Sequence, residues 1–133
     1  MITYNDIYEA LRKEKYSEQI QPLDKKFIKE VSEYLKDKKE ITEKKDDMLP
    51  DAVIKNKKQF ENAISIFKEL VLRRKKKILS LAFIARETGI SKADFDSMFD
   101  SEVEMFDKIV KSLEALDKNI ESLLNGKKDE SHL

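Results

Sequence analysis

The sequence predicts an all-α protein, a helical bundle of about five helices built around one long central helix. Composition is the first reason, because only two Gly and two Pro occur among 133 residues, of which 41% are charged. The second is that apolar residues recur every three or four positions in each major segment. The third is residues 51–88, which contain neither Gly nor Pro and would form a helix roughly 55 Å long.

The N-terminal part predicts two helices. Thr3 is a good N-cap, and Asp6 stands three residues later, as in an acidic capping box. We therefore expect a first helix over residues 4–15. Asp24 is the expected N-cap of a second helix that continues to about residue 43. Because the polar break over residues 44–50 is short, the next helix should run antiparallel to the second.

The central helix is expected to begin at Pro50 and to end at Gly89, a glycine in the usual C′ position. Its apolar stripe is expected at Phe60, Ile64, Phe67, Val71, Ile78, Leu81 and Ala85. Arg74 interrupts this stripe, so we expect a buried arginine that needs a carboxylate partner. The acidic C-terminal helix is the nearest supply, through Glu104, Asp107, Glu114 and Asp117, and a partner subunit is the alternative.

The C-terminal part predicts a short helix capped by Ser91, with Asp94 three residues on, and then a longer helix over residues 100–124. Asn125 and Gly126 follow it as a stop signal. We expect residues 1–125 to form one helical domain. Residues 126–133 are expected to be a disordered tail or the start of a linker.

Charge is distributed unevenly along a chain whose formal net charge is zero. Residues 51–89 carry +6 and residues 90–133 carry −5. Packing the two segments together would neutralise both, which we favour over a nucleic-acid surface. The basic run over residues 73–77 is a candidate patch formed by Arg73, Lys75, Lys76 and Lys77. The simpler interpretation is a solvated face in which Arg73 pairs with Glu69.

The sequence offers few groups for catalysis. It contains no Cys, its one histidine is His132 in the expected tail, and no Gly-rich phosphate loop or metal-binding motif is present. We therefore expect a protein that is not an enzyme and takes no cofactor, metal or small-molecule substrate. No apolar run approaches the ~18 residues of a membrane span, so a cytoplasmic protein is expected.

The end of the central helix is apolar on nearly all sides, and a helix of this kind needs neighbours on more than one side. We therefore expect an oligomer interface there. The expected interface residues are Ile78, Leu79, Leu81, Ala82, Phe83 and Ile84.

An alternative function is DNA binding. Residues 84–99 have the spacing of a helix-turn-helix motif, with Gly89 in the turn and Ser91 capping the second helix. That second helix carries Asp94 and Asp96, whereas a recognition helix normally presents basic or amide side chains to the groove. DNA binding by this segment, together with the basic run, is thus the second hypothesis.

Three stretches in order resemble the helical A domain of archaeal GINS subunits of the type in which the A domain comes first. They are Tyr-x-x-Ile-Tyr-x-x-Leu-Arg-Lys-Glu over residues 4–14, Leu-Asp-x-x-Phe over residues 23–27, and the Leu, Arg-Arg, Lys and Ile of Leu-Val-Leu-Arg-Arg-Lys-Lys-Lys-Ile over residues 70–78. The resemblance covers about residues 2–125, and it depends on order and spacing because charged helices match one another easily.

The resemblance implies a non-catalytic subunit of a homo- or hetero-tetramer that joins the MCM ring in the replicative helicase. In that family the A domains pack helix to helix to form the tetramer. A small β-rich B domain usually follows and binds a RecJ-like partner. This chain departs from the pattern because its 133 residues include no B domain. The expected role is therefore assembly, with weak or no direct binding to nucleic acid.

Overall fold

The computed structural model describes residues 1–43 and 49–126. The described residues form five helices: α1 (Tyr4–Lys15), α2 (Phe27–Glu43), α3 (Pro50–Glu87), α4 (Lys92–Asp96) and α5 (Asp100–Leu124). No strand occurs among them, so the all-α prediction is confirmed. The expected polar break and the expected tail include residues 44–48 and 127–133, which lie outside the described part of the chain.

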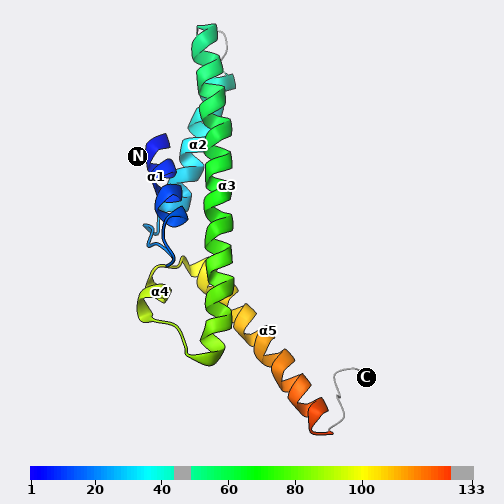
Figure 1. The fold of residues 1–133 in the computed structure, drawn as a ribbon. Coiled ribbons are helices and arrows are strands. Elements are labelled where there is room, and N and C mark those ends of the chain that lie inside the picture. Colours follow the sequence, from blue (N-terminus) through cyan, green and yellow to red (C-terminus); the bar gives the residue numbers. More distant parts are fainter. Residues whose placement is uncertain (44–48, 127–133) are drawn as a thin grey trace.

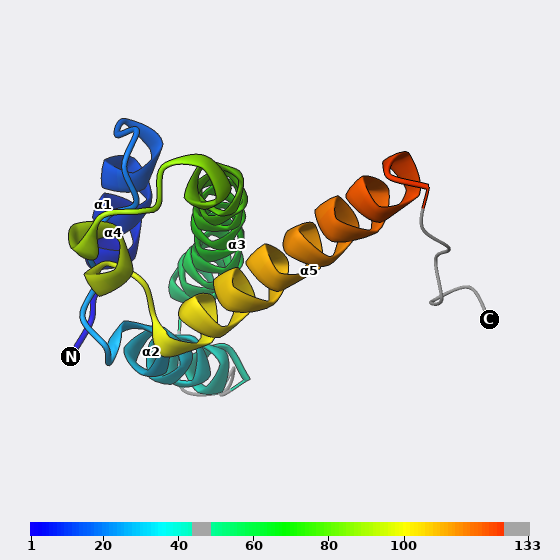
Figure 2. The ribbon, with the colours of Figure 1, turned by 90° about the horizontal axis from the view of Figure 1, so that it is seen from below.

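The bundle is organised along α3, its longest helix (Figure 1). α1 and α2 lie beside the first part of α3, whereas α4 and the beginning of α5 lie beside its second part. α5 then projects away from the other helices, which is also visible in the perpendicular view (Figure 2). The last turns of α5 therefore have no neighbouring helix among the described residues.

Local hydrogen bonds explain where the helices begin and end. The Asp6 N–H donates to Thr3 Oγ1 at 3.2 Å, and the Thr3 N–H donates to the Asp6 carboxylate at 2.8 Å. These bonds from Thr3 lower the pKa of Asp6. With Asp24 as N-cap, α2 was predicted to start at Lys25, which is two residues before its observed start at Phe27. Asp24 Oδ1 instead accepts the Lys26 N–H at 2.8 Å, so a turn precedes the helix.

The remaining helix ends agree with the predictions. α3 begins at Pro50, and Gly89 follows it with φ of 77°, a backbone conformation that favours glycine. The Asp94 N–H donates to Ser91 Oγ at 3.2 Å and thereby caps α4. Gly126 follows α5 with φ of 76°.

α2 and α3 are antiparallel, as expected from the short connection between them. The rings of Phe27 and Phe67 have centroids 6.4 Å apart. Further along α2, Lys38 Nζ donates to Asn56 Oδ1 at 3.2 Å. Residue numbers therefore rise along α2 as they fall along α3.

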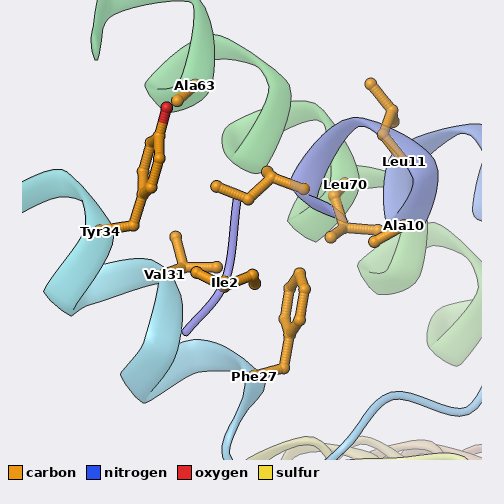
Figure 3. Close-up of a cluster of buried hydrophobic side chains, with 9 residues drawn as sticks. Ile2, Ala10, Leu11, Phe27, Val31, Tyr34, Ala63 and Leu70 are labelled. Carbon is orange, nitrogen blue, oxygen red and sulfur yellow. The ribbon is translucent and has the colours of Figure 1, made fainter. Parts of the chain in front are cut away.

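Two apolar clusters stabilise the bundle. The first joins α1, α2 and the first part of α3, and Figure 3 shows Ile2, Phe27, Val31 and Leu70 converging there. The second joins the end of α3, the α4–α5 junction and the start of α5, and it also includes Ile20. Burying a side chain of this size contributes about 1.5–3 kcal/mol relative to exposure, so both clusters are substantial.

The buried line of α3 differs from the predicted stripe. Its fully buried members are Ala63, Leu70, Arg74, Ile78 and Ala82. The predicted positions Phe60, Ile64, Phe67 and Val71 are only half-buried, although Ile78 is correct. α1, α2 and α5 all contact α3, so the deepest positions lie between its neighbours. No helix in the described ranges is long and apolar enough to cross a membrane.

Candidate functional site

Arg74 lies in the centre of the bundle, with 1% of its surface exposed. Its Nε and Nη2 donate to the two carboxylate oxygens of Glu102 at 2.9 and 2.8 Å, a bidentate ion pair. Nη1 donates to Glu14 Oε1 at 2.8 Å and to the Gln21 carbonyl oxygen at 2.6 Å. Nη2 also donates to the Ser97 carbonyl oxygen at 2.9 Å. Each guanidinium nitrogen of Arg74 therefore has an acceptor.

Lys77 extends this cluster by one helical turn. Its Nζ donates to a carboxylate oxygen of Glu14, to the Glu14 carbonyl oxygen at 2.7 Å and to the Gln19 carbonyl oxygen at 3.0 Å. The carboxylate of Glu14, which is itself fully buried, also accepts the Gln21 N–H at 3.1 Å. We call Glu14, Arg74, Lys77 and Glu102 the ion cluster. Two positive and two negative charges balance within it.

The ion cluster connects segments that are far apart in the sequence. Glu14 belongs to the last turn of α1, Arg74 and Lys77 to α3, and Glu102 to the first turn of α5. Glu102 also accepts the Phe99 N–H at 2.8 Å and so caps α5, while the Phe99 ring lies 4.9 Å from the Arg74 guanidinium carbon. The cluster thus fixes the beginning of α5 against α1 and α3.

Electrostatics explain how a cation is tolerated at this depth. Burial alone would lower the pKa of Arg74, but the hydrogen bonds and charges of Glu102 and Glu14 outweigh it and raise that pKa above its usual value. A buried ion pair with all its donors satisfied adds specificity of packing more than stability. The ion cluster therefore fixes the positions of the helices that it joins.

The burial of Arg74 agrees with the prediction, and its partner Glu102 belongs to the predicted acidic C-terminal helix, but none of the four carboxylates named there pairs with Arg74. Glu104 pairs instead with Lys108 on the exposed face of α5. Glu114 and Asp117 pair with Arg86, in the last turn of α3, at 3.3 and 3.1 Å. No ion pair of Asp107 is found among the described residues.

Glu14 is the cluster residue that the sequence analysis missed. A signal for it is present in α1, because Glu14 follows Ile7 and Leu11 at intervals of four and three. It thus shares the helical face that these two apolar residues bury. A carboxylate on an apolar face needs a cation, and α3 carries a cation on its own apolar face. Matching the two faces would have predicted the pair.

The basic run is not one continuous patch. Arg73 pairs with Glu69 at 3.0 Å, as expected for neighbours one turn apart. Lys77 is directed into the ion cluster, so its inclusion in a solvent-facing patch was wrong. Lys75 and Lys76 are exposed. The cations of the run thus fall on different sides of α3, because five consecutive residues span more than one turn.

The predicted interface residues divide into two groups. Ile78 and Ala82 are fully buried in the second apolar cluster, and Leu81 is half-buried against it. Ile78 and Ala82 cannot serve an interface, because α5, the α4–α5 junction and Ile20 already cover them. The other three predicted residues are exposed: Leu79 by 44%, Phe83 by 62% and Ile84 by 49%.

Two of these exposed residues align with a third. Leu72 is 49% exposed and stands seven residues before Leu79, and Phe83 follows four residues after Leu79. At 100° per residue these positions share one side of α3, opposite Arg74. We call Leu72, Leu79 and Phe83 the outer line. Ile84 lies on a different side of the helix and borders a shallow groove with Ile20.

The segment with helix-turn-helix spacing contains a very short second helix. α4 has five residues, Lys92–Asp96, which is about 1.4 turns. Its Phe95 ring packs edge-on against Phe106 of α5 with centroids 5.4 Å apart. α4 is thus anchored to α5 through an aromatic contact, and the geometry does not favour its use as a recognition helix.

No group of three or more Asp, Glu, His or Cys side chains is arranged for a metal in residues 1–43 and 49–126. The one histidine, His132, lies outside these ranges. Comparisons with protein-family models, with curated proteins and with solved structures found no match to this chain. The candidate functional site is therefore chosen from the structure alone. We choose the outer line, formed by Leu72, Leu79 and Phe83.

Proposed function

We propose that this chain is a non-catalytic assembly subunit of a GINS-like tetramer that acts with the MCM helicase in DNA replication. The outer line is the observation that carries the assembly role. Three large apolar side chains are 44–62% exposed in one row, on a helix whose opposite side is fully covered. Isolated apolar residues are normal on a protein surface, whereas aligned ones are typical of interaction surfaces.

The ion cluster supports the same role. An assembly subunit has to present its contact surface in a defined orientation. The ion cluster holds α1, α3 and α5 together through hydrogen bonds of 2.6–3.1 Å among buried groups. The outer line is consequently carried by a helix that is held from its other side.

The link to replication depends on the sequence resemblance over about residues 2–125. One of the resembling stretches, residues 70–78, lies in the part of α3 that carries both Arg74 and the start of the outer line. In the GINS family the A domains assemble helix against helix. An apolar row on the central helix is the type of surface that such packing uses.

Light scattering coupled to size-exclusion chromatography tests the assembly role. We expect the full chain, alone or with its partner subunit, to elute at a multiple of its own mass at micromolar concentration. The double variant Leu79→Ser/Phe83→Ser should shift this mass toward that of one chain. Leu49→Ser, at a residue that is 77% exposed and away from the outer line, is the matched control. A strict monomer under all these conditions would refute the assembly role.

The helicase part of the proposal has its own test. Co-migration of the assembled protein with the MCM hexamer of the same organism is expected on a sizing column. Assembly without co-migration would remove the helicase role and leave the assembly role intact.

Direct binding to DNA is expected to be weak, because Arg73 and Lys77 already have carboxylate partners. Fluorescence anisotropy with duplex and single-stranded DNA at low salt measures it. Strong salt-dependent binding that is lost in Lys75→Gln/Lys76→Gln would favour the DNA-binding alternative.

A further inference from the structure

Lysines border the outer line on both sides. At about 100° per residue around α3, Lys68 and Lys75 lie along one edge of the row, and Lys76 lies along the other edge. All three lysines are exposed. Within the described ranges, none of the three forms an ion pair with a carboxylate. The outer line is therefore an apolar row between two uncompensated positive edges.

The other cations in this part of α3 already have partners. Arg74 and Lys77 belong to the ion cluster. Arg73 pairs with Glu69 within α3, and Arg86 pairs with two carboxylates of α5. The positive charge that remains uncompensated is thus concentrated beside the exposed apolar row.

Lys76 also borders the shallow groove that contains Ile20 and Ile84. Glu18 and Asp94 line the same groove, yet neither forms an ion pair with Lys76 in the described part of the chain. The positive edge at Lys76 is therefore not neutralised by the carboxylates that share its groove.

The same pair of lysines occurs earlier in α3 without an apolar row. The Lys-Lys pair at residues 57–58 precedes the pair at residues 75–76 by 18 residues, or about five turns, so the two pairs occupy the same sides of the helix. Glu61 occupies the position that corresponds to Leu79, and a serine occupies the position that corresponds to Phe83. The earlier segment thus has the charge without the apolar row.

The shape of the outer line fits a helix. Its side chains follow at intervals of seven and four residues and span about 16 Å along α3, a spacing that helices use when they pack along their length. A helix that covered the row with its own apolar residues would place its flanking residues against the two lysine edges. Acidic flanks would then pair with the lysines, so apolar contact and charge agree on an amphipathic acidic helix.

A second copy of this chain fits the outer line less well. Two outer lines packed on each other would bring lysines against lysines, and like charges in contact are unfavourable. On α5, Glu114 and Asp117 already pair with Arg86 of the same chain. The charges thus favour a helix that belongs to a different protein.

An anionic membrane also fits less well than a helix. Glu61 and Glu87 are exposed on the same half of α3, one before the outer line and the other after it. A flat anionic surface would face these carboxylates together with the lysines. A helix that crosses α3 at an angle contacts only the middle of this side, where the lysines and the apolar row lie.

We propose that the outer line is the docking surface for an amphipathic helix of a different protein, with glutamate or aspartate on both flanks of its apolar row. The inference rests on the proposed function for taking that protein to be a partner subunit, and it adds the chemistry by which the subunit is recognised. The apolar row supplies the buried contact. Lys68, Lys75 and Lys76 select the partner and its orientation through charge.

Two designed peptides of about three heptads test this recognition. Both carry leucine at the a and d positions, and they differ only in having glutamate or lysine at the e and g positions. Like charges at these positions oppose self-association of each peptide. Fluorescence anisotropy of the labelled peptides measures Kd with the full chain. We expect saturable binding of the glutamate peptide and at least about tenfold weaker binding of the lysine peptide.

Charge reversal on α3 should invert this preference. The variant Lys75→Glu/Lys76→Glu is expected to bind the lysine peptide more tightly than the glutamate peptide. Lys57→Glu/Lys58→Glu makes the same change on the same sides of α3 about five turns earlier, and it should leave both Kd values within about twofold of wild type. Circular dichroism checks that each variant is folded. Equal effects of the two double variants would show that net charge alone attracts the peptide and would overturn the proposal.

The apolar row is tested with Leu79→Ser/Phe83→Ser. This variant keeps all three lysines and should weaken binding of the glutamate peptide at least about tenfold, because burial of the two side chains is lost. Unchanged affinity in this variant contradicts docking on the outer line. Wild-type chain that shows no saturable binding, or no preference between the two peptides, contradicts it as well.

The other occupants give different results. Cosedimentation with vesicles of phosphatidylserine and phosphatidylcholine, lost in Leu79→Ser/Phe83→Ser and accompanied by no preference between the peptides, would assign the row to a membrane and overturn the proposal. An oligomer of the chain alone that the same variant dissociates would assign the row to a second copy, which retains the assembly role and refutes this inference. A chain that stays monomeric, alone and with its partner subunit, yet discriminates between the peptides refutes the assembly role and retains the docking surface.

Discussion

The two sides of α3 reverse the usual distribution of polar and apolar residues. The inner side places a guanidinium, Arg74, at 1% exposure, whereas the outer side leaves Leu72, Leu79 and Phe83 at 44–62%. The inner side is stable because each guanidinium nitrogen has an acceptor. We assign the outer side to the proposed assembly role. Hydropathy alone therefore does not assign a side of this helix to the core.

In α5, buried and exposed apolar residues are separated along the length of the helix, whereas in α3 they lie on opposite sides. Phe106 and Leu116 belong to the same row of apolar residues spaced three and four apart, yet the first is 4% exposed and the second 56%. The difference depends on whether α3 is still alongside. Phe106 and Leu116 thus occupy equivalent positions in the sequence pattern but differ in burial, because only Phe106 has α3 beside it.

Removing the buried cation should have the largest effect on the inner side. Arg74→Leu leaves the carboxylate of Glu102 without its partner and Glu14 with Lys77 alone. We expect the free energy of unfolding to fall by about 3–5 kcal/mol, the usual result of breaking a buried ion pair. Urea denaturation followed by circular dichroism measures this. Lys76→Leu on the exposed surface should stay within about 0.5 kcal/mol, and equal small losses in the two variants would contradict the distinction.

Two leucines of α3 allow its inner and outer sides to be compared through the same substitution, Leu→Ala. Leu70 is 1% exposed and Leu72 is 49% exposed, two residues apart. Leu70→Ala should lower the free energy of unfolding by about 2–5 kcal/mol through lost burial and a cavity. Leu72→Ala should change it by less than about 0.5 kcal/mol at protein concentrations where the chain is monomeric. A loss of similar size in both variants would mean that the outer line is packed within a single chain.

A substitution of Tyr34 should change the free energy of unfolding by a smaller amount and should raise it. Its hydroxyl is buried near Ala63 without a hydrogen-bond partner among the described residues (Figure 3). Tyr34→Phe removes this unpaired group, so the free energy of unfolding should rise by about 1 kcal/mol. Thermal melting at neutral pH measures it. Tyr8→Phe, at a residue that is 46% exposed, should leave the melting temperature unchanged.

The same residue predicts a dependence on alkaline pH. Burial, and to a lesser extent Tyr4, raises the pKa of Tyr34 above its usual value near 10. The folded state thus favours the neutral phenol. This stabilisation is complete below the unfolded pKa and is lost as the pH rises through the folded pKa. Wild type should lose more stability than Tyr34→Phe across that range, and parallel curves for the two would contradict this account.

The smallest effect is expected for the exposed ion pair between Glu69 and Arg73. Both side chains are more than a third exposed, Glu69 by 44% and Arg73 by 35%. Glu69→Ala should cost only a few tenths of a kcal/mol, and added salt should reduce even that. The loss caused by Arg74→Leu should vary far less with salt. Similar salt dependence in both would mean that water reaches the ion cluster.

Much of the local structure could be predicted from the sequence. Thr3, Pro50, Gly89 and Ser91 each mark a helix end through hydrogen bonds or backbone angles that involve only nearby residues. The burial of Arg74 was also predictable, because an arginine within an apolar stripe has few alternatives. These features depend on interactions within a few residues, so sequence spacing is enough to identify them.

The partners of Arg74 were not predictable in the same way. Glu14 is 60 residues away and Glu102 is 28 residues away. Several other carboxylates of α5 were equally plausible from sequence, and the choice depended on which turn of α5 lies beside Arg74. Likewise, residues 78–85 were correctly seen to be apolar around the helix, but the division between Ile78 inside and Phe83 outside needed the positions of α5 and Ile20.

The sequence by itself determined the helices, most of their ends and the need to compensate a buried charge, because these follow from local hydrogen bonding and from the free energy of desolvation. Only the tertiary structure decided which carboxylates meet Arg74, which side of α3 remains open and where α5 loses its neighbour. The physical reason is that packing depends on the relative placement and length of whole helices. Those quantities are set by contacts between residues far apart in the chain.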